Sequence, residues 1–260
     1  RNPFMAIGNR IRGRVKSTFG AATPASALAT GLLIGDTSGV PAAELNDLRR
    51  SGLSHYVAVS GSNVAMFLLA WWFIGAPIAI RPRLRVVYGL FGLIVFAVAT
   101  RWEPSVIRAS VMAAVPLVGG LVGLPVDPWM ALGTAVTILL LVSAELATSV
   151  GFLLSVLATG GVLIGVTAVR GRRPSWLWIS LGATLGAQVA VSPLLLAVFG
   201  SVPLAAPLAN LVAAPVVSIT SFAAMVTVVV PAPPLTGLAL GGSQLVLHIA
   251  RIGSGGPQLG

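Results

Sequence analysis

Cationic side chains at a few defined places give this sequence its clearest chemistry. Arg49 and Arg50 end a short amphipathic segment, and Arg101 and Arg108 lie on either side of the start of an apolar one. Guanidinium groups bind phosphate, so these positions suit a nucleic-acid backbone. Anionic lipid headgroups are the alternative partner, because Lys and Arg also collect near membrane surfaces.

The sequence offers few residues for metal binding or for catalysis. The sequence has no cysteine, only two histidines (His55 and His248) and six scattered carboxylates. No HExxH, paired-carboxylate or P-loop pattern occurs, so we expect no metal site, no cofactor and no nucleotide hydrolysis. A Ser60–His248 dyad, which would make the chain an intramembrane serine hydrolase, remains an open alternative because such a dyad needs only these two residue types within reach.

The composition indicates which elements carry these residues. Of 260 residues, 56% are hydrophobic and 8% are charged, with a mean hydropathy of +0.97 and a net charge of +10. An average soluble domain has about 25% charged residues, so we predict an all-α, polytopic helical membrane protein. Eight apolar spans are predicted, at 53–75, 84–100, 105–122, 128–144, 147–169, 175–199, 204–230 and 235–250.

Several of these spans are expected to be broken, at Gly61, Pro193 and Pro215. Broken helices are tolerated where they line protein or water, which keeps a small-solute transporter as a third alternative. Before the spans we predict a flexible basic lead-in at 1–22 and short extracytoplasmic or interfacial helices at 23–52. The spans form one domain, 53–250, followed by a tail, 251–260. Because the first residue is Arg1, we expect a piece of a longer protein.

Polar side chains recur on one face of several predicted spans. A polar stripe on a membrane helix has to face protein or water, because unpaired polar groups are costly in hydrocarbon. These stripes serve either helix packing or the wall of a polar path. We expect His55, Ser62, Ser155 and Asn210 to face the protein interior. The candidates for the path are His55, Ser60, Gly61, Ser62, Asn63, Arg101, Arg108, Ser155, Thr159, Gln188 and Asn210, with Arg49 and Arg50 at its outer mouth.

The arginine-rich loops predict the orientation. Four predicted spans separate the loops 81–85 and 170–173, so both loops lie on one side, which the excess of positive charge makes cytoplasmic. Both ends of the chain are then extracytoplasmic.

Four segments, in order, resemble the competence domain of the ComEC family of DNA-uptake proteins. They are GLLIGDTSGVPAAELNDLRRSGLSHYVAVSGSNVAM, WEPSVIRASVMA, GFLLSVLATGGVL and SPLLLAVFGSVPLAAPLANLVAAP, within residues 24–225. The resemblance implies a channel that passes single-stranded DNA inward across the bacterial cytoplasmic membrane during natural transformation. The chain departs from the family pattern at Asn63, where histidine is usual, and at Leu153, where glutamine is usual.

The resemblance also implies partners. Besides single-stranded DNA and membrane lipid, we expect a cytoplasmic DNA translocase ATPase and an outer DNA receptor, and a homodimer is left open. The chain itself is expected not to be an enzyme. The OB-fold and metallo-β-lactamase-like domains that relatives carry have no counterpart in this sequence.

Overall fold

Proline and glycine set the limits of many helices. The second helix, α2 (Pro24–Ile34), starts with proline behind the N-cap residue Thr23, whose hydroxyl accepts a hydrogen bond from the backbone N–H of Ser26. It ends at Gly35, which adopts φ = 70°, a left-handed conformation that glycine reaches without steric cost. Proline fits the first helical turn because its missing N–H has no intrahelical acceptor there.

The computed structural model describes residues 3–20, 23–57, 61–75 and 81–259. Its other helices are α1 (Pro3–Phe19), α3 (Ala42–Arg50), α4 (Ser54–Val57), α5 (Gly61–Gly75), α6 (Pro82–Ala99), α7 (Pro104–Leu121), α8 (Pro128–Val142), α9 (Val150–Ala168), α10 (Ser175–Phe199), α11 (Ala206–Val229) and α12 (Pro233–Ser254). A short 3₁₀ helix, η1 (Ala144–Thr148), precedes α9. Two strands, β1 (Val202–Pro203) and β2 (Gln258–Leu259), pair antiparallel and attach the C-terminal segment to the loop after α10.

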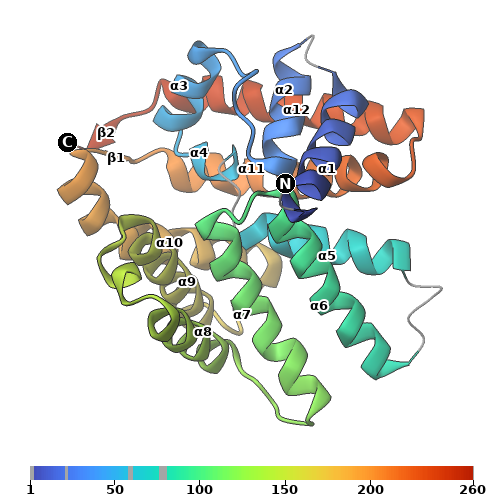
Figure 1. Cartoon of the computed structure of the whole chain (residues 1–260). Coiled ribbons are helices and arrows are strands. Elements are labelled where there is room, and N and C mark those ends of the chain that lie inside the picture. The colour runs from blue at the N-terminus through green and yellow to red at the C-terminus, as the bar shows by residue number, and fades with distance from the viewer. Residues whose placement is uncertain (1–2, 21–22, 58–60, 76–80, 260) are drawn as a thin grey trace.

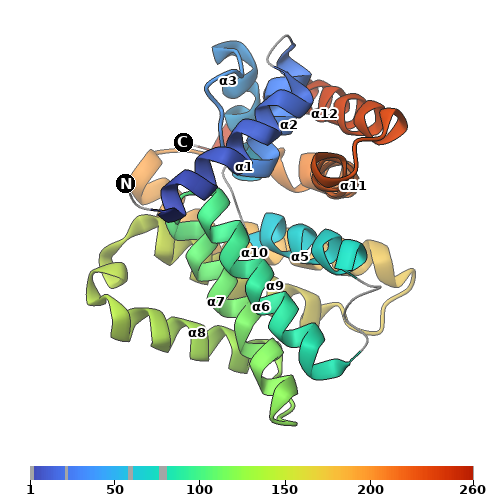
Figure 2. The same cartoon turned by 45° about the vertical axis from the view of Figure 1, so that its right-hand side comes forward.

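The helices form two groups (Figures 1 and 2). One contains α1 to α4 with α11 and α12, and the other contains α5 to α10. Helix α2 is buried from Ala25 to Ile34 and contributes to both hydrophobic cores, one through Ala29 and Leu33 and the other through Leu28 and Leu32. From Ala25 to Ile34, α2 is therefore covered by protein on all sides, including its polar residues Ser26 and Thr30.

The predicted spans agree with helices to within a few residues, but this agreement does not establish how many of the helices cross a membrane. Within the described residues, four helices are long and apolar enough to cross a membrane: α9, α10, α11 and α12. The segment around α5, together with α7 and α8, forms shorter apolar helices. A crossing takes about 20 residues, so eight spans are not confirmed.

The predicted breaks at Pro193 and Pro215 are wrong, because α10 and α11 run through them as continuous helices. Neighbouring groups in a membrane protein can satisfy the carbonyl that proline leaves free. Near Gly61, α4 ends at Val57 and α5 begins at Gly61, and residues 58–60 lie outside the described part. The basic lead-in is also not a flexible segment, since most of it forms α1, which packs on α2 and α6.

Helices α9 and α10 pack through glycines. Gly161 and Gly165 of α9 face Gly186 and Gly182 of α10, and a Cβ at any of the four would overlap the backbone of the opposite helix. Each pair has the spacing GxxxG, which allows membrane helices to approach closely. The sequence contains these GxxxG motifs, but our prediction of helix contacts used polar residues and did not use the glycines.

Candidate functional site

A cavity of about 470 Å³ lies among the N-terminal helices and the loop after α6. Its charged lining consists of three arginines, Arg12, Arg49 and Arg101, against one carboxylate, Glu103. These residues come from α1, α3 and the α6–α7 loop, so the cavity exists only when distant segments fold together. Its charge is suited to an anion.

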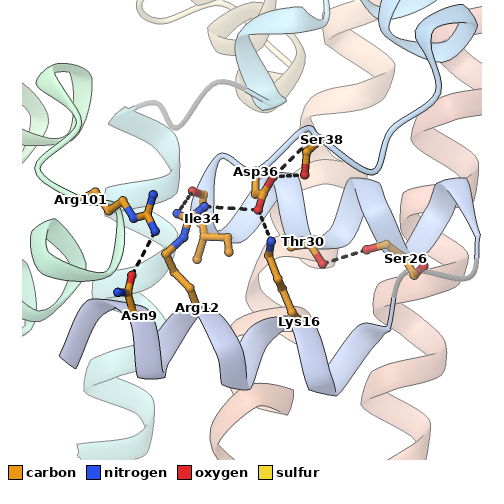
Figure 3. A network of polar contacts seen from close by, with 9 residues as sticks. All are labelled: Asn9, Arg12, Lys16, Ser26, Thr30, Ile34, Asp36, Ser38 and Arg101. Atoms are coloured by element: carbon orange, nitrogen blue, oxygen red, sulfur yellow. Dashed lines mark hydrogen bonds and ion pairs between the residues drawn. The ribbon is translucent and has the colours of Figure 1, made fainter. Parts of the chain in front are cut away.

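Asp36 holds one side of the cavity in place (Figure 3). Its carboxylate accepts hydrogen bonds from Lys16 (2.6 Å), from Arg12 (3.3 Å) and from the hydroxyl of Ser38 (2.6 Å). The bonds from Lys16 and Ser38 hold the pKa of Asp36 well below its usual range. Asp36 therefore stays ionised and fixes α1 against the segment that follows α2.

Arg12 has both a structural and an electrostatic role. Its Nη1 donates to the carbonyl oxygen of Ile34 at 3.0 Å, one of the last carbonyls of α2, where a cation is favoured by the helix dipole. Burial and the nearby charge of Arg101 lower the pKa of Arg12, and Asp36 opposes that effect. Since Arg12 and Arg101 repel each other, an anion between them would be stabilised.

The backbone at Arg101 has an unusual conformation. Arg101 and Trp102 have φ values of 57° and 58°, a region in which residues other than glycine are uncommon. The carbonyls of Val98 and Ala97, at the end of α6, accept hydrogen bonds from the two backbone N–H groups at 3.2 and 2.7 Å. Such conformations cost about 1–3 kcal/mol each and cluster at functional sites. The turn directs Arg101 to the cavity, where its Nη2 donates to Asn9 at 3.0 Å.

Of the predicted cations, Arg49 and Arg101 line this cavity, whereas the neighbouring Arg50 does not. Both Arg49 and Arg50 are exposed, and the backbone oxygen of Arg50 accepts a hydrogen bond from Gln258. Sequence reasoning missed Arg12 as a site residue. It belongs to a basic run at 10–16, whose composition indicates a surface segment rather than part of a site.

The residues near the start of the predicted first span separate in the structure. His55 is accessible to solvent, and the carbonyl of Gly52 lies 2.9 Å from its Nδ1. Ser60 and the side chain of Ser62 lie outside the described residues, and Gly61 is exposed. The Ser60–His248 pairing is therefore untested, and His248 itself is exposed on α12.

Asn63 has a defined structural role. It is 1% exposed, and its Nδ2 donates to the carbonyl oxygen of Leu32 at 2.8 Å. This carbonyl belongs to the last turn of α2, where the helix offers it no N–H. Asn63 and Arg12 therefore both cap the same helix end. This task needs an amide donor and no titration, so it is compatible with asparagine where the family pattern has histidine.

The remaining path candidates lie away from the cavity. Ser155 and Thr159 are half-buried on α9, where the Thr159 hydroxyl donates to the Ser155 carbonyl. Gln188 on α10 and Asn210 on α11 are half-buried, and each keeps one buried polar atom without a hydrogen-bond partner. Arg108 is 7% exposed. None of these five side chains lines the cavity of Arg12, Arg49 and Arg101.

Within the described ranges, no group of three or more His, Asp or Glu side chains is arranged to hold a metal ion. The chemistry that the cavity offers is that of guanidinium, hydroxyl and backbone groups, which bind anions.

Long apolar helices, exposed apolar side chains along α9 and α10, and a glycine-mediated helix pair define a helical membrane protein. A model of the competence protein family matches residues 32–253. The chain belongs to this family, and so has a role in competence, the uptake of DNA. No match was found among curated proteins or solved structures.

Proposed function

We propose that the protein is a channel that passes single-stranded DNA inward across the bacterial cytoplasmic membrane during natural transformation. The observation that carries the proposal is the cavity in which Arg12, Arg49 and Arg101 converge. Proteins that bind single strands without sequence preference use a positively charged groove along the backbone. The cavity would hold the strand at the outer mouth of the channel.

Arg49 offers the sharpest test of this site. None of the three ion pairs among the described residues involves it, so Arg49→Gln removes a charge from the cavity without breaking a structural contact. Arg50→Gln is the matched control, because Arg50 is the exposed neighbour outside the lining. Binding of oligothymidylate to the purified protein would be measured as a function of salt concentration, together with transformation frequency and surface capture of DNA in the host.

We expect Arg49→Gln to weaken binding and to reduce the slope of log K against log salt by about 0.7, the value for one phosphate contact on a single strand. Transformation falls while surface capture stays unchanged. Equal effects of the two substitutions would show that general surface charge, and not the cavity, holds the strand.

The proposed orientation places both chain ends outside the cytoplasm and the basic segments near 81–85 and 170–173 inside. Support comes from the excess of arginine in both segments, and the orientation requires that the chain crosses the membrane an even number of times between them. The natural lack of cysteine permits a direct test. In Pro82→Cys and Ser175→Cys variants, an impermeant thiol reagent should label both positions from the same, cytoplasmic side. Labelling from opposite sides would contradict the orientation.

In this proposal the chain catalyses no reaction, so other proteins deliver the DNA strand and pull it through the channel. The sequence has no P-loop, so a cytoplasmic translocase ATPase would supply the pulling force. An outer DNA receptor would deliver the strand, membrane lipid would surround the apolar helices, and a second copy could complete the pore. A fluorophosphonate that labels Ser60 would instead support the hydrolase alternative.

A further inference from the structure

Arg108 is a buried cation that forms no ion pair in the described part of the chain. It lies in the second turn of α7 and is 7% exposed. No ion pair there includes it, and its Nε is buried without a hydrogen-bond partner. A charged side chain held away from water is costly unless an opposite charge accompanies it.

The start of α9 adds to the positive potential around Arg108. The Nη2 of Arg108 lies 4.0 Å from the position that a Cβ on Gly151 would take. Gly151 is the second residue of α9, and the N-cap residue Ser149 makes no side-chain hydrogen bond to the first turn. The N-terminus of a helix carries free N–H groups and a partial positive charge. Two positive features therefore face each other, which an anion between them would stabilise.

The nearby acidic residues do not contact Arg108. Glu103, the N-cap residue of α7, is close enough to attract it electrostatically, but it is exposed and forms no ion pair with it. Glu145 lies in η1, is also exposed and forms no ion pair with Arg108. Gly151 is exposed, so an external anion can reach the Nη2 edge of the guanidinium. A buried arginine without an ion pair and an uncapped helix N-terminus thus meet at an accessible point.

We propose that Arg108 and the first turn of α9 form a binding site for one phosphate-type oxyanion. Its ligand during transport is a phosphodiester of the DNA strand, an assignment that rests on the proposed function. One guanidinium and one helix end bind a single phosphate weakly, which permits release and onward movement. The site is separate from the cavity, since Arg108 is not part of its lining.

The test uses the purified full chain in maltoside detergent, with thermal unfolding followed by tryptophan fluorescence. Chloride is replaced by inorganic phosphate at constant ionic strength. We expect phosphate to raise the unfolding midpoint of the wild type. The part of this response that comes from phosphate in the cavity should fall in Arg49→Gln, whereas the part due to Arg108 should be lost in Arg108→Gln and partly kept in Arg108→Lys. In the Arg49→Gln background, Arg108→Gln should remove most of the remaining response, which separates this site from the cavity.

Gly151→Asp provides a second arm that does not depend on removing the arginine. A carboxylate at this position can reach Nη2, so it should weaken phosphate binding at least tenfold and raise the midpoint without phosphate. Gly151→Asp in an Arg108→Gln background controls for the general benefit of an acid in a first helical turn. The increase in midpoint should be clearly smaller there. Gly160→Ala, in mid-helix where a Cβ meets no neighbouring atom, should leave the phosphate response unchanged.

A wild type that unfolds at the same midpoint in phosphate and in chloride would overturn the proposal, as would a response in the Arg49→Gln background that survives both Arg108→Gln and Gly151→Asp. Oligothymidylate and phosphatidylglycerol are then compared as competitors for phosphate. Competition by oligothymidylate supports the strand as ligand, whereas competition by phosphatidylglycerol alone would overturn that assignment. DNA uptake is measured independently, so a failed channel with an intact phosphate response is distinguishable from a failed site.

Discussion

Replacing Asp36 with asparagine should release α1 from the rest of the protein. The carboxylate accepts hydrogen bonds from Arg12, whose side chain is 16% exposed, and from Lys16, whose side chain is 54% exposed. The exposed Lys16 pair contributes about 1 kcal/mol or less. The Arg12 pair is better shielded, and a hydrogen bond to a charged group contributes about 1.5–3 kcal/mol. Asp36→Asn should therefore destabilise the docking of α1 by about 3 kcal/mol.

Cysteine labelling at Val15 can measure this change. Val15 lies on α1 and is 3% exposed, so a Val15→Cys thiol reacts with a maleimide only when α1 opens. A loss of about 3 kcal/mol corresponds to an increase in labelling rate of about 150-fold, because each 1.4 kcal/mol is a factor of ten. Labelling under native conditions in detergent, with and without Asp36→Asn, gives the ratio directly.

Glu44→Gln is the matched control. Glu44 pairs at 3.8 Å with Arg251, whose side chain is 66% exposed, and this pair joins α3 to α12. Such exposed pairs contribute about 1 kcal/mol or less, so labelling at Val15 should change by less than about fivefold. If Asp36→Asn changes the rate no more than the control does, the carboxylate does not hold α1 and the reasoning is refuted.

Three further predictions concern stability. The folded pKa of Asp36 is depressed, so its contribution to stability is present above the unfolded pKa of about 3.9 and is lost as pH falls. At pH values below about 4, the thermal unfolding midpoint of the wild type should therefore decrease, and that of Asp36→Asn should decrease less. Gly165→Ala should lower the midpoint because its Cβ would overlap α10, whereas Gly160→Ala, with open space around it, should leave it unchanged or raise it. Equal shifts would contradict the glycine-mediated packing. Asn63→Ala should cost about 1–3 kcal/mol by leaving the Leu32 carbonyl buried without its donor, and an unchanged midpoint would argue against the cap.

The sequence alone determined the class of protein and the position of most helices. Hydropathy and the placement of proline are local properties, so α10 was predicted with the same limits that the structure shows, 175–199. The ordered motifs also led to the family that the comparison then identified. The number of spans was not determined, because a helix of 15 to 18 apolar residues can either cross a membrane or be buried in protein.

Only the tertiary structure decided which polar residues work together. Asp36 meets Arg12 across 24 residues of sequence, and Asn63 meets the Leu32 carbonyl across 31. Helical periodicity places a residue on a face of its own helix, but it does not say which other helix that face meets. The burial of α2, the meeting of Arg12, Arg49 and Arg101 at one cavity, and the position of Arg108 beside α9 all depend on such contacts. They are set by the packing of whole helices, which no short stretch of sequence contains.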